Sequence, residues 1–126
     1  MRTFYTVERT TYEGDRLVAH LANGQLLQGL ADADQLLAHS DDLSFLSILE
    51  NDEGYTYILW PQPIWVDLKK GWDERKEVVM CDGASTVSLP HFWVNLENLI
   101  GNIEGNANYG DEMVAAVEEA FFASAK

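Results

Sequence analysis

A chain of 126 residues with 47% hydrophobic and 23% charged residues has the size and composition of one globular domain, so we expect a single domain over residues 1–126. Its formal net charge of −13 argues against nucleic acid or an anionic membrane as a direct partner, because those surfaces would repel it. A lone cysteine excludes an intrachain disulfide, and no apolar run has the length of a signal peptide or a membrane span, so we expect a cytoplasmic protein.

The first part of the chain has the pattern of short strands joined by turns. Residues Thr3–Thr11 alternate and are rich in Thr, Tyr, Phe and Val, which predicts a strand. The turn Glu13-Gly14-Asp15 leads into a second strand, Arg16–Leu21, and the two form a hairpin. After an Asn-Gly turn signal, residues Gln25–Gly29 predict a short third strand.

The middle of the chain predicts one short helix and then more strands. Residues Ala31–His39 fit a short helix with carboxylates near its positive end. The clearest hairpin joins Leu43–Glu50 to Tyr55–Trp60. After two prolines, Ile64–Leu68 predicts a strand with Ile64, Val66 and Leu68 on one face and Trp65 and Asp67 on the other.

The last third begins with a polar loop over Lys69–Lys76 and a hairpin of Glu77–Cys81 with Ser85–Leu89. Residues Phe92–Ile103 have one apolar stripe and predict a helix. A final helix begins at Asp111, with an inner face that extends to Ser124. The order of elements predicts an α+β fold: an antiparallel sheet of about five to seven strands, one short early helix, and two C-terminal helices packed on one face.

The negative charge is concentrated in two stretches that contain no Lys or Arg. One extends from Leu17 to Leu68 and the other from Glu77 to Ala125, and the basic cluster Lys69–Lys76 separates them. Self-repulsion among so many acids destabilises the compact state, so the pattern calls for an explanation. General solubility, or adaptation to a salty cytoplasm, is one explanation, and a surface that faces a basic partner is the other.

No catalytic, cofactor-binding or metal-binding residue emerges from the motifs. The histidines form no His-x-His or His-Glu-x-x-His spacing, and His39-Ser40-Asp41-Asp42 has the composition of a solvated turn rather than a metal site. Cys81 follows Val78-Val79-Met80 with no cation beside it, which favours an inert buried thiol. We therefore expect no cofactor, and the absence of motifs favours a protein that is not an enzyme.

Acidic pairs and aromatic residues are the remaining candidates for a binding surface. If Ile64, Val66 and Leu68 face the core, Trp65 faces away from it; a position under the terminal helices or at a domain edge is the other placement. Aromatic side chains near acids are typical of protein-binding hot spots. The candidate partner-binding residues are Asp41, Asp42, Asp52, Glu53, Tyr55, Tyr57, Trp65 and Trp72.

Two functions of different classes remain open. The first is a non-catalytic acidic interaction protein, such as an inhibitor or immunity-type protein that binds a basic nuclease or toxin. The alternative is a small-ligand-binding or enzymatic domain with a pocket between the sheet and the terminal helices, and its candidate polar groups are His20, Tyr57, Asp67 and His91. A homodimer formed through the aromatic edge is a third interpretation.

Overall fold

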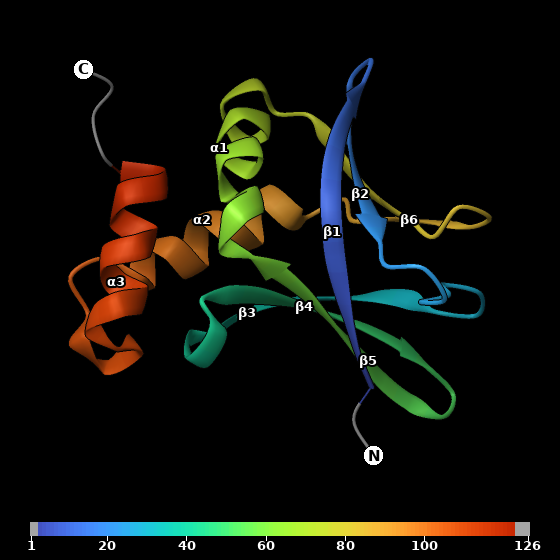
Figure 1. Ribbon diagram of the computed structural model, residues 1–126, viewed down its shortest axis with the longest axis horizontal. Coiled ribbons are helices and arrows are strands. Elements are labelled where there is room, and N and C mark those ends of the chain that lie inside the picture. The colour runs from blue at the N-terminus through green and yellow to red at the C-terminus, as the bar shows by residue number, and fades with distance from the viewer. Residues whose placement is uncertain (1–2, 123–126) are drawn as a thin grey trace.

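Seven strands form one mixed, curled sheet in the computed structural model, which describes residues 3–122 (Figure 1). Their order across the sheet is β3-β4-β5-β1-β2-β6-β7. The strands are β1 (Thr3–Glu13), β2 (Arg16–Leu21), β3 (Ala31–His39), β4 (Ser44–Asn51), β5 (Gly54–Pro61), β6 (Glu77–Cys81) and β7 (Thr86–Ser88). The α+β class and the three predicted hairpins, β1–β2, β4–β5 and β6–β7, are confirmed.

The prediction of a wholly antiparallel sheet is wrong, because two of the strand pairs are parallel. Strand β1 pairs with β5 from Thr3↔Thr56 to Thr6↔Leu59, and β2 pairs with β6 from Arg16↔Glu77 to His20↔Cys81. Both pairs join strands that are far apart in the sequence. Turn signals report only on consecutive strands, so they cannot reveal pairings of this kind.

Residues Ala31–His39 form the edge strand β3 and not the predicted early helix. Leu36 pairs with Ser47 and is buried, while the next residue, Leu37, pairs with Leu46 and is exposed on the other side. The pairing is irregular between Asp32 and Leu36, and Asp34 there adopts a positive φ of 60°. Pairing with β4 therefore overrides a weak local helix preference.

The segment between β2 and β3 packs into the core without forming the strand predicted over Gln25–Gly29. Leu27 is buried, and its backbone N–H donates to the Asp82 carboxylate at 2.7 Å. The Tyr5 hydroxyl donates to the carbonyl of Leu26 at 3.0 Å. Because side chains satisfy these backbone groups, the segment does not need a partner strand. The backbone N–H groups of Leu27, Ser85 and Ala84 hold the pKa of Asp82 below its ordinary value.

A helix replaces the strand predicted over Ile64–Leu68 and most of the loop predicted over Lys69–Lys76. A 3-10 turn, Gln62–Ile64, leads into α1 (Trp65–Glu74), which ends at Arg75 with a left-handed φ of 53°. Pro63 sits in the first turn, where a missing N–H costs nothing. Trp65, Leu68 and Gly71 recur every three residues on the buried side, and Val66 is 71% exposed.

The two predicted C-terminal helices are present as α2 (Phe92–Ile103) and α3 (Asp111–Val117), and α3 continues as a π-helical turn over Glu118–Phe122. Ser124 lies outside the described residues. Each helical segment brings an aromatic ring to one face of the sheet: Trp65 stacks on Phe45 at 4.4 Å between ring centroids, Phe92 lies 4.8 Å from Trp60, and Phe121 lies 5.8 Å from Phe45. The main core is therefore on the helical side of the sheet.

None of the described helices has the length and apolar character needed to cross a membrane.

Candidate functional site

The structure separates the predicted partner-binding residues between the two sides of the sheet. Tyr55 and Tyr57 alternate with the buried residues Thr56 and Ile58 of β5, so both tyrosines lie on the side away from the helices. Trp65 and Trp72 belong to α1, on the helical side. The tyrosines and the tryptophans therefore do not share one surface.

The outer side of β3, β4, β5 and β1 carries an apolar surface of its own. In the register of the strands, Leu37 lies opposite Leu46, and Phe4 lies opposite Tyr57. The Phe4 and Tyr57 rings stack with 5.4 Å between centroids. Phe4, Leu37 and Tyr55 are 43%, 46% and 56% exposed. We call this surface the outer patch and define it by Phe4, Leu37, Leu46, Tyr55 and Tyr57.

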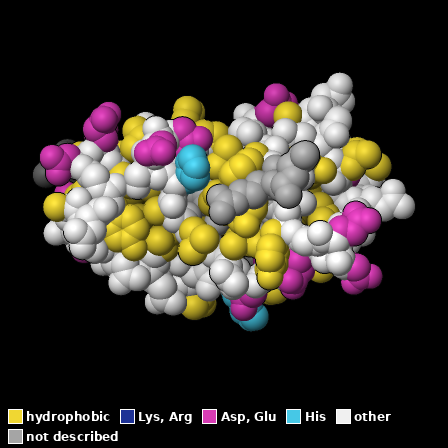
Figure 2. All heavy atoms as spheres, turned by 90° about the horizontal axis from the view of Figure 1, so that it is seen from below, with side chains coloured by type: hydrophobic (Ala, Val, Ile, Leu, Met, Phe, Trp, Pro, Cys, Tyr) yellow, Lys and Arg dark blue, Asp and Glu magenta, His cyan; other side chains and the backbone are white. Residues whose placement is uncertain are grey.

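A shallow groove of about 260 Å³ crosses the outer patch. Its walls are formed by Phe4, Leu46 and Tyr57 together with residues 37–39 of β3. Figure 2 shows this side of the molecule: hydrophobic side chains gather across its middle, and acidic side chains lie around its margins. An exposed apolar area with a polar margin is typical of a protein-binding surface.

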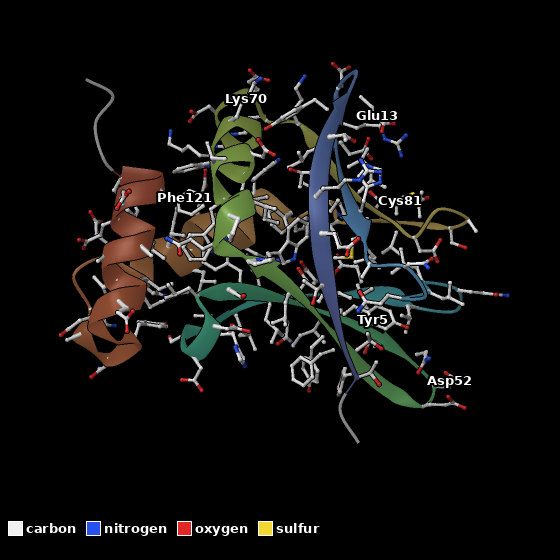
Figure 3. The ribbon with its side chains drawn as sticks, in the orientation of Figure 1. Tyr5, Glu13, Asp52, Lys70, Cys81 and Phe121 are labelled. Atoms are coloured by element: carbon white, nitrogen blue, oxygen red, sulfur yellow. The ribbon has the colours of Figure 1, made fainter. Side chains whose placement is uncertain are left out.

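The predicted acids lie at the two ends of the β4–β5 hairpin and not in one cluster. Asp41 and Asp42 occupy the 3-10 turn Ser40–Asp42, just before β4. Asp52 and Glu53 form the turn between β4 and β5, where Figure 3 shows Asp52 at the hairpin tip. The seven residue steps of β4 separate the two pairs by about 23 Å. The acids therefore bracket the outer patch.

Few cations compensate these acids. Asp42 contacts His39, with 2.7 Å between the carboxylate oxygen and Nδ1. In the described part of the chain, no Lys or Arg forms an ion pair with Asp41, Asp42, Asp52 or Glu53. Because the four side chains project into solvent, their charge is available to attract a cationic surface.

Trp65 is a core residue, so the prediction that its side chain faces away from the core is wrong. It is 1% exposed, and its indole N–H donates to the carbonyl of Trp60 at 2.9 Å. The prediction failed because it assumed a strand, with a period of two, where the chain forms a helix. The placement under the terminal helices is the one that the structure has, since Phe121 lies 6.0 Å from the Trp65 ring.

Trp72 is half-buried and is held by neighbours within the chain. Its indole N–H donates to the Glu97 carboxylate at 2.6 Å, and Arg75 contacts the same carboxylate oxygen at 2.5 Å. The Trp72 hydrogen bond, followed by the Arg75 contact, lowers the pKa of Glu97. This bonding links α1 to α2, so Trp72 has a structural role.

Three residues of the outer patch, Phe4, Leu37 and Leu46, are not among the partner-binding residues predicted from the sequence. Phe4 belongs to a correctly predicted strand, and the alternation of that strand was the signal that could have placed it beside Tyr57. Leu37 belongs to the segment Ala31–His39, for which the sequence predicted a helix where the structure has strand β3. Its exposure follows only from the pairing of β3 with β4.

The polar groups proposed for a small-ligand pocket do not converge. His20 contacts the Thr11 hydroxyl at 2.8 Å, while Asp67 accepts a hydrogen bond from the Thr10 hydroxyl, and neighbouring residues of a strand point to opposite sides. His91 lies 3.3 Å from the Asp34 carboxylate, and Tyr57 belongs to the outer patch. These groups therefore occupy separate places in the fold.

Two further groups near α1 and β1 have shifted pKa values. Burial, and next the charge of Asp67, raises the pKa of Tyr12 to about 12, and its hydroxyl donates to the carbonyl of Asp67 at 2.5 Å. Burial, and next the charge of Arg9, lowers the pKa of His20. Burial is the larger cause in both cases, so both shifts mainly reflect packing.

No group of three or more His, Cys, Asp or Glu side chains among the described residues is arranged to hold a metal ion. Cys81 is partly buried, and its sulfur accepts a hydrogen bond from the backbone N–H of Gly83 at 3.3 Å.

Comparison with known proteins gives one family. Residues 5–121 match a family described as a "Family of unknown function (UPF0738)". A UPF0738 protein of Lysinibacillus sphaericus is 37% identical over 121 residues, which cover 96% of this chain and 95% of the relative. A UPF0738 protein of Geobacillus kaustophilus is 36% identical over 123 residues, covering 97% and 98%. No solved structure matches the chain at a significant level.

Proposed function

The chain belongs to the UPF0738 family, and we propose that it is a non-catalytic protein whose outer patch binds a basic protein partner. The observation that carries the proposal is an exposed apolar surface bracketed by acids without Lys or Arg partners in the described chain. An inhibitor or immunity-type role against a basic nuclease or toxin is the specific form of this function.

The apolar centre and the acidic margin support binding in different ways. Phe4, Leu37 and Tyr55 already expose a large part of their surface, so a partner that covers them gains the free energy of apolar burial. Aromatic rings are frequent anchors in such interfaces because they bury a large area with few rotatable bonds. The acids at either end accelerate the encounter with a cationic surface and select against acidic proteins.

Charge argues against a homodimer formed through the same surface. Two copies of a chain with a net charge of −13 would bring their acidic hairpin ends together. Like charges that face each other across an interface weaken binding by about 2–5 kcal/mol. A basic partner removes this repulsion and replaces it with attraction.

The test begins with affinity capture from a cell extract and continues with the purified partner. We expect a protein with a basic surface, bound at least tenfold more weakly by the double variant Asp41→Lys/Asp52→Lys than by the wild type. The matched control is Glu104→Lys/Glu119→Lys, which changes the net charge equally at exposed positions on the helical side. Calorimetry at low and high salt measures both affinities.

A neutral or acidic partner, or equal affinities of the outer and control variants, would contradict the proposal. Binding that does not change with salt would remove the electrostatic part of it. Self-association of the wild type at micromolar concentration, abolished by Leu37→Lys, would support the homodimer in its place.

A further inference from the structure

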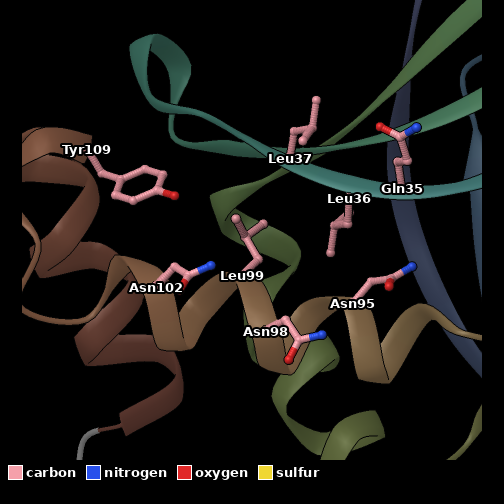
Figure 4. A pocket seen from close by; sticks show the side chains of 8 residues that line it. All are labelled: Gln35, Leu36, Leu37, Asn95, Asn98, Leu99, Asn102 and Tyr109. Atoms are coloured by element: carbon pink, nitrogen blue, oxygen red, sulfur yellow. The ribbon is translucent and has the colours of Figure 1, made fainter.

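A second groove runs between the edge strand β3 and helix α2, on a different side of β3 from its pairing with β4. It has a volume of about 340 Å³ and is open to solvent along its length. Figure 4 shows Gln35 and Leu37 of β3 above it and Asn95, Asn98 and Asn102 of α2 below it, with Tyr109 at one end. Leu36 and Leu99, each 8% exposed, form its apolar floor.

Charged side chains are absent from the described lining of this groove, although the chain as a whole carries a net charge of −13. Amides take their place. Asn95, Asn98 and Asn102 are spaced by three and four residues, so they lie along one face of α2. Amide side chains both donate and accept hydrogen bonds, which suits a neutral ligand that offers both kinds of group.

The amides at the centre of the groove are available for a ligand. Asn95 donates to the Asp34 carboxylate at 2.9 Å and thereby closes one end. The side chains of Asn98 and Asn102 make no hydrogen bond to any described part of the chain. Along the helix axis, Asn95 and Asn102 are about 10 Å apart, which is the length of roughly three residues of extended peptide.

The β3 edge supplies backbone groups to the same groove. β3 is the last strand of the sheet, so the N–H and C=O groups on its other edge point away from β4. For residues 35–38, no backbone hydrogen bond to α2 or to another described element occupies that edge. An unpaired strand edge is a template for a further strand.

We propose that this groove binds an extended, uncharged peptide segment, which adds to the edge of β3 as a strand while α2 contacts its other side. The free strand edge favours a peptide over other neutral ligands, because it offers donors and acceptors at the spacing of a β-ladder. The amides of Asn98 and Asn102 bind the polar groups that the new strand turns toward α2. The groove shares Leu37 with the outer patch, but its amides Asn98 and Asn102 lie on α2, away from that patch, so different variants test the two proposals.

The experiment uses the full chain and a library of random nonapeptides displayed on phage. We expect enrichment of sequences that lack charged residues. A selected peptide, made synthetically, is expected to shift the amide resonances of residues 35–38 and the side-chain amide resonances of Asn98 and Asn102 in a nitrogen-15 labelled sample. It is expected to bind at least tenfold more weakly to the double variant Asn98→Asp/Asn102→Asp.

Two matched controls isolate the mechanism. Asn23→Asp/Gln28→Glu adds the same two charges at exposed positions of the β2–β3 connection, and we expect binding within twofold of the wild type. The same peptide N-methylated at alternate residues keeps its side chains but lacks the donors of a strand, and we expect it to lose binding.

Several outcomes would overturn the inference. These are no enrichment from the library, equal binding of the N-methylated peptide, or equal binding to the variant with Asn98 and Asn102 changed. Binding of a neutral oligosaccharide such as cellotetraose at these resonances without binding of any peptide would assign the groove to a different ligand. Selection of basic peptides that shift outer-patch resonances instead supports the proposed function and counts against this site, so the two proposals fail separately.

Discussion

The β4–β5 hairpin has two apolar sides that differ in what covers them. On the inner side, Phe45 and Trp60 are completely buried beneath rings from α1, α2 and the last helical turn. On the outer side, Tyr55 remains 56% exposed, and the Tyr57 ring stacks on Phe4 of the neighbouring strand β1. Alternate residues of one hairpin therefore support folding on one side and remain accessible for binding on the other.

The acids around the outer patch differ from those elsewhere in the fold in what they bond. Asp82 and Glu97, away from the outer patch, accept hydrogen bonds that tie segments of the fold together. Asp41, Asp52 and Glu53 have no comparable partner in the described chain. Some acids of this chain therefore stabilise the fold, whereas the charge of others is available to a partner.

Truncating a core ring is the strongest test of this difference. Trp65→Ala removes a buried ring and its hydrogen bond to Trp60, so we expect the free energy of unfolding to fall by about 3–5 kcal/mol. Tyr55→Ala, on the outer side, is expected to change it by less than about 0.5 kcal/mol. Urea denaturation measures both values. Similar losses for the two variants would mean that the outer side is also part of the core.

Removal of an acid that bonds backbone groups should lower the stability of the fold less than truncation of a core ring, and the loss should depend on pH. Asp82→Ala leaves the N–H groups of Leu27, Ala84 and Ser85 without their acceptor, so we expect the Tm at pH 7 to fall by roughly 5 °C. Because the pKa of Asp82 is lowered in the folded state, its contribution is complete above the ordinary value of 3.8 and is lost as the pH falls through the folded pKa.

The difference in Tm between wild type and Asp82→Ala should therefore be constant from pH 5 to 7 and shrink below about pH 4. Differential scanning calorimetry across this range measures it. The control is Asp52→Ala, whose side chain bonds no backbone group in the described chain, and its Tm should match that of the wild type. A Tm difference between wild type and Asp82→Ala that increases as the pH falls would contradict the assigned role of Asp82.

Removing the apolar centre of the outer patch should affect binding and not folding. Phe4→Ser/Leu37→Ser deletes two half-exposed apolar side chains, so we expect affinity for the captured partner to fall at least tenfold, or about 1.4 kcal/mol. Calorimetric titration measures the affinity, and the urea midpoint tests that the fold is intact. Val66→Ser/Val94→Ser, at exposed positions of α1 and α2, is the control and should bind as the wild type does.

The salt dependence should show the smallest effect. Raising the ionic strength from about 0.05 M to 0.5 M is expected to slow association of the wild type with its partner several-fold, because the Debye length shrinks. Asp52→Asn/Glu53→Gln should reduce this dependence while leaving the dissociation rate nearly unchanged. Stopped-flow or surface-plasmon measurements give both rates. An unchanged salt dependence would exclude the hairpin turn from the encounter.

The α+β class, three hairpins and two terminal helices were predictable because each depends on a local pattern. Residues Tyr55–Trp60 alternate with the period of a strand, and Phe92–Ile103 has apolar residues at the spacing of a helix. A few residues therefore suffice to identify each element. The turns that hold acids at both ends of β4 were also predictable, since turns are recognised from short sequence signals.

Two segments were misassigned because their patterns permit both a helix and a strand. The residue types in segment 31–39 are compatible with a helix, and only pairing with β4 makes this segment an edge strand. Residues 64–68 alternate as a strand does, but two prolines and the stacking of Trp65 on Phe45 favour helix α1. In both cases a contact outside the segment decided between a helix and a strand.

The sequence by itself therefore determined the charge, the turns and the elements whose periodicity is unambiguous. Tertiary structure alone decided the parallel pairings of β1 with β5 and β2 with β6, the burial of Trp65, and the meeting of Phe4, Leu37 and Tyr57 on one surface. The physical reason is that local patterns specify which side of an element is apolar, whereas the choice of partner depends on the packing of the whole chain.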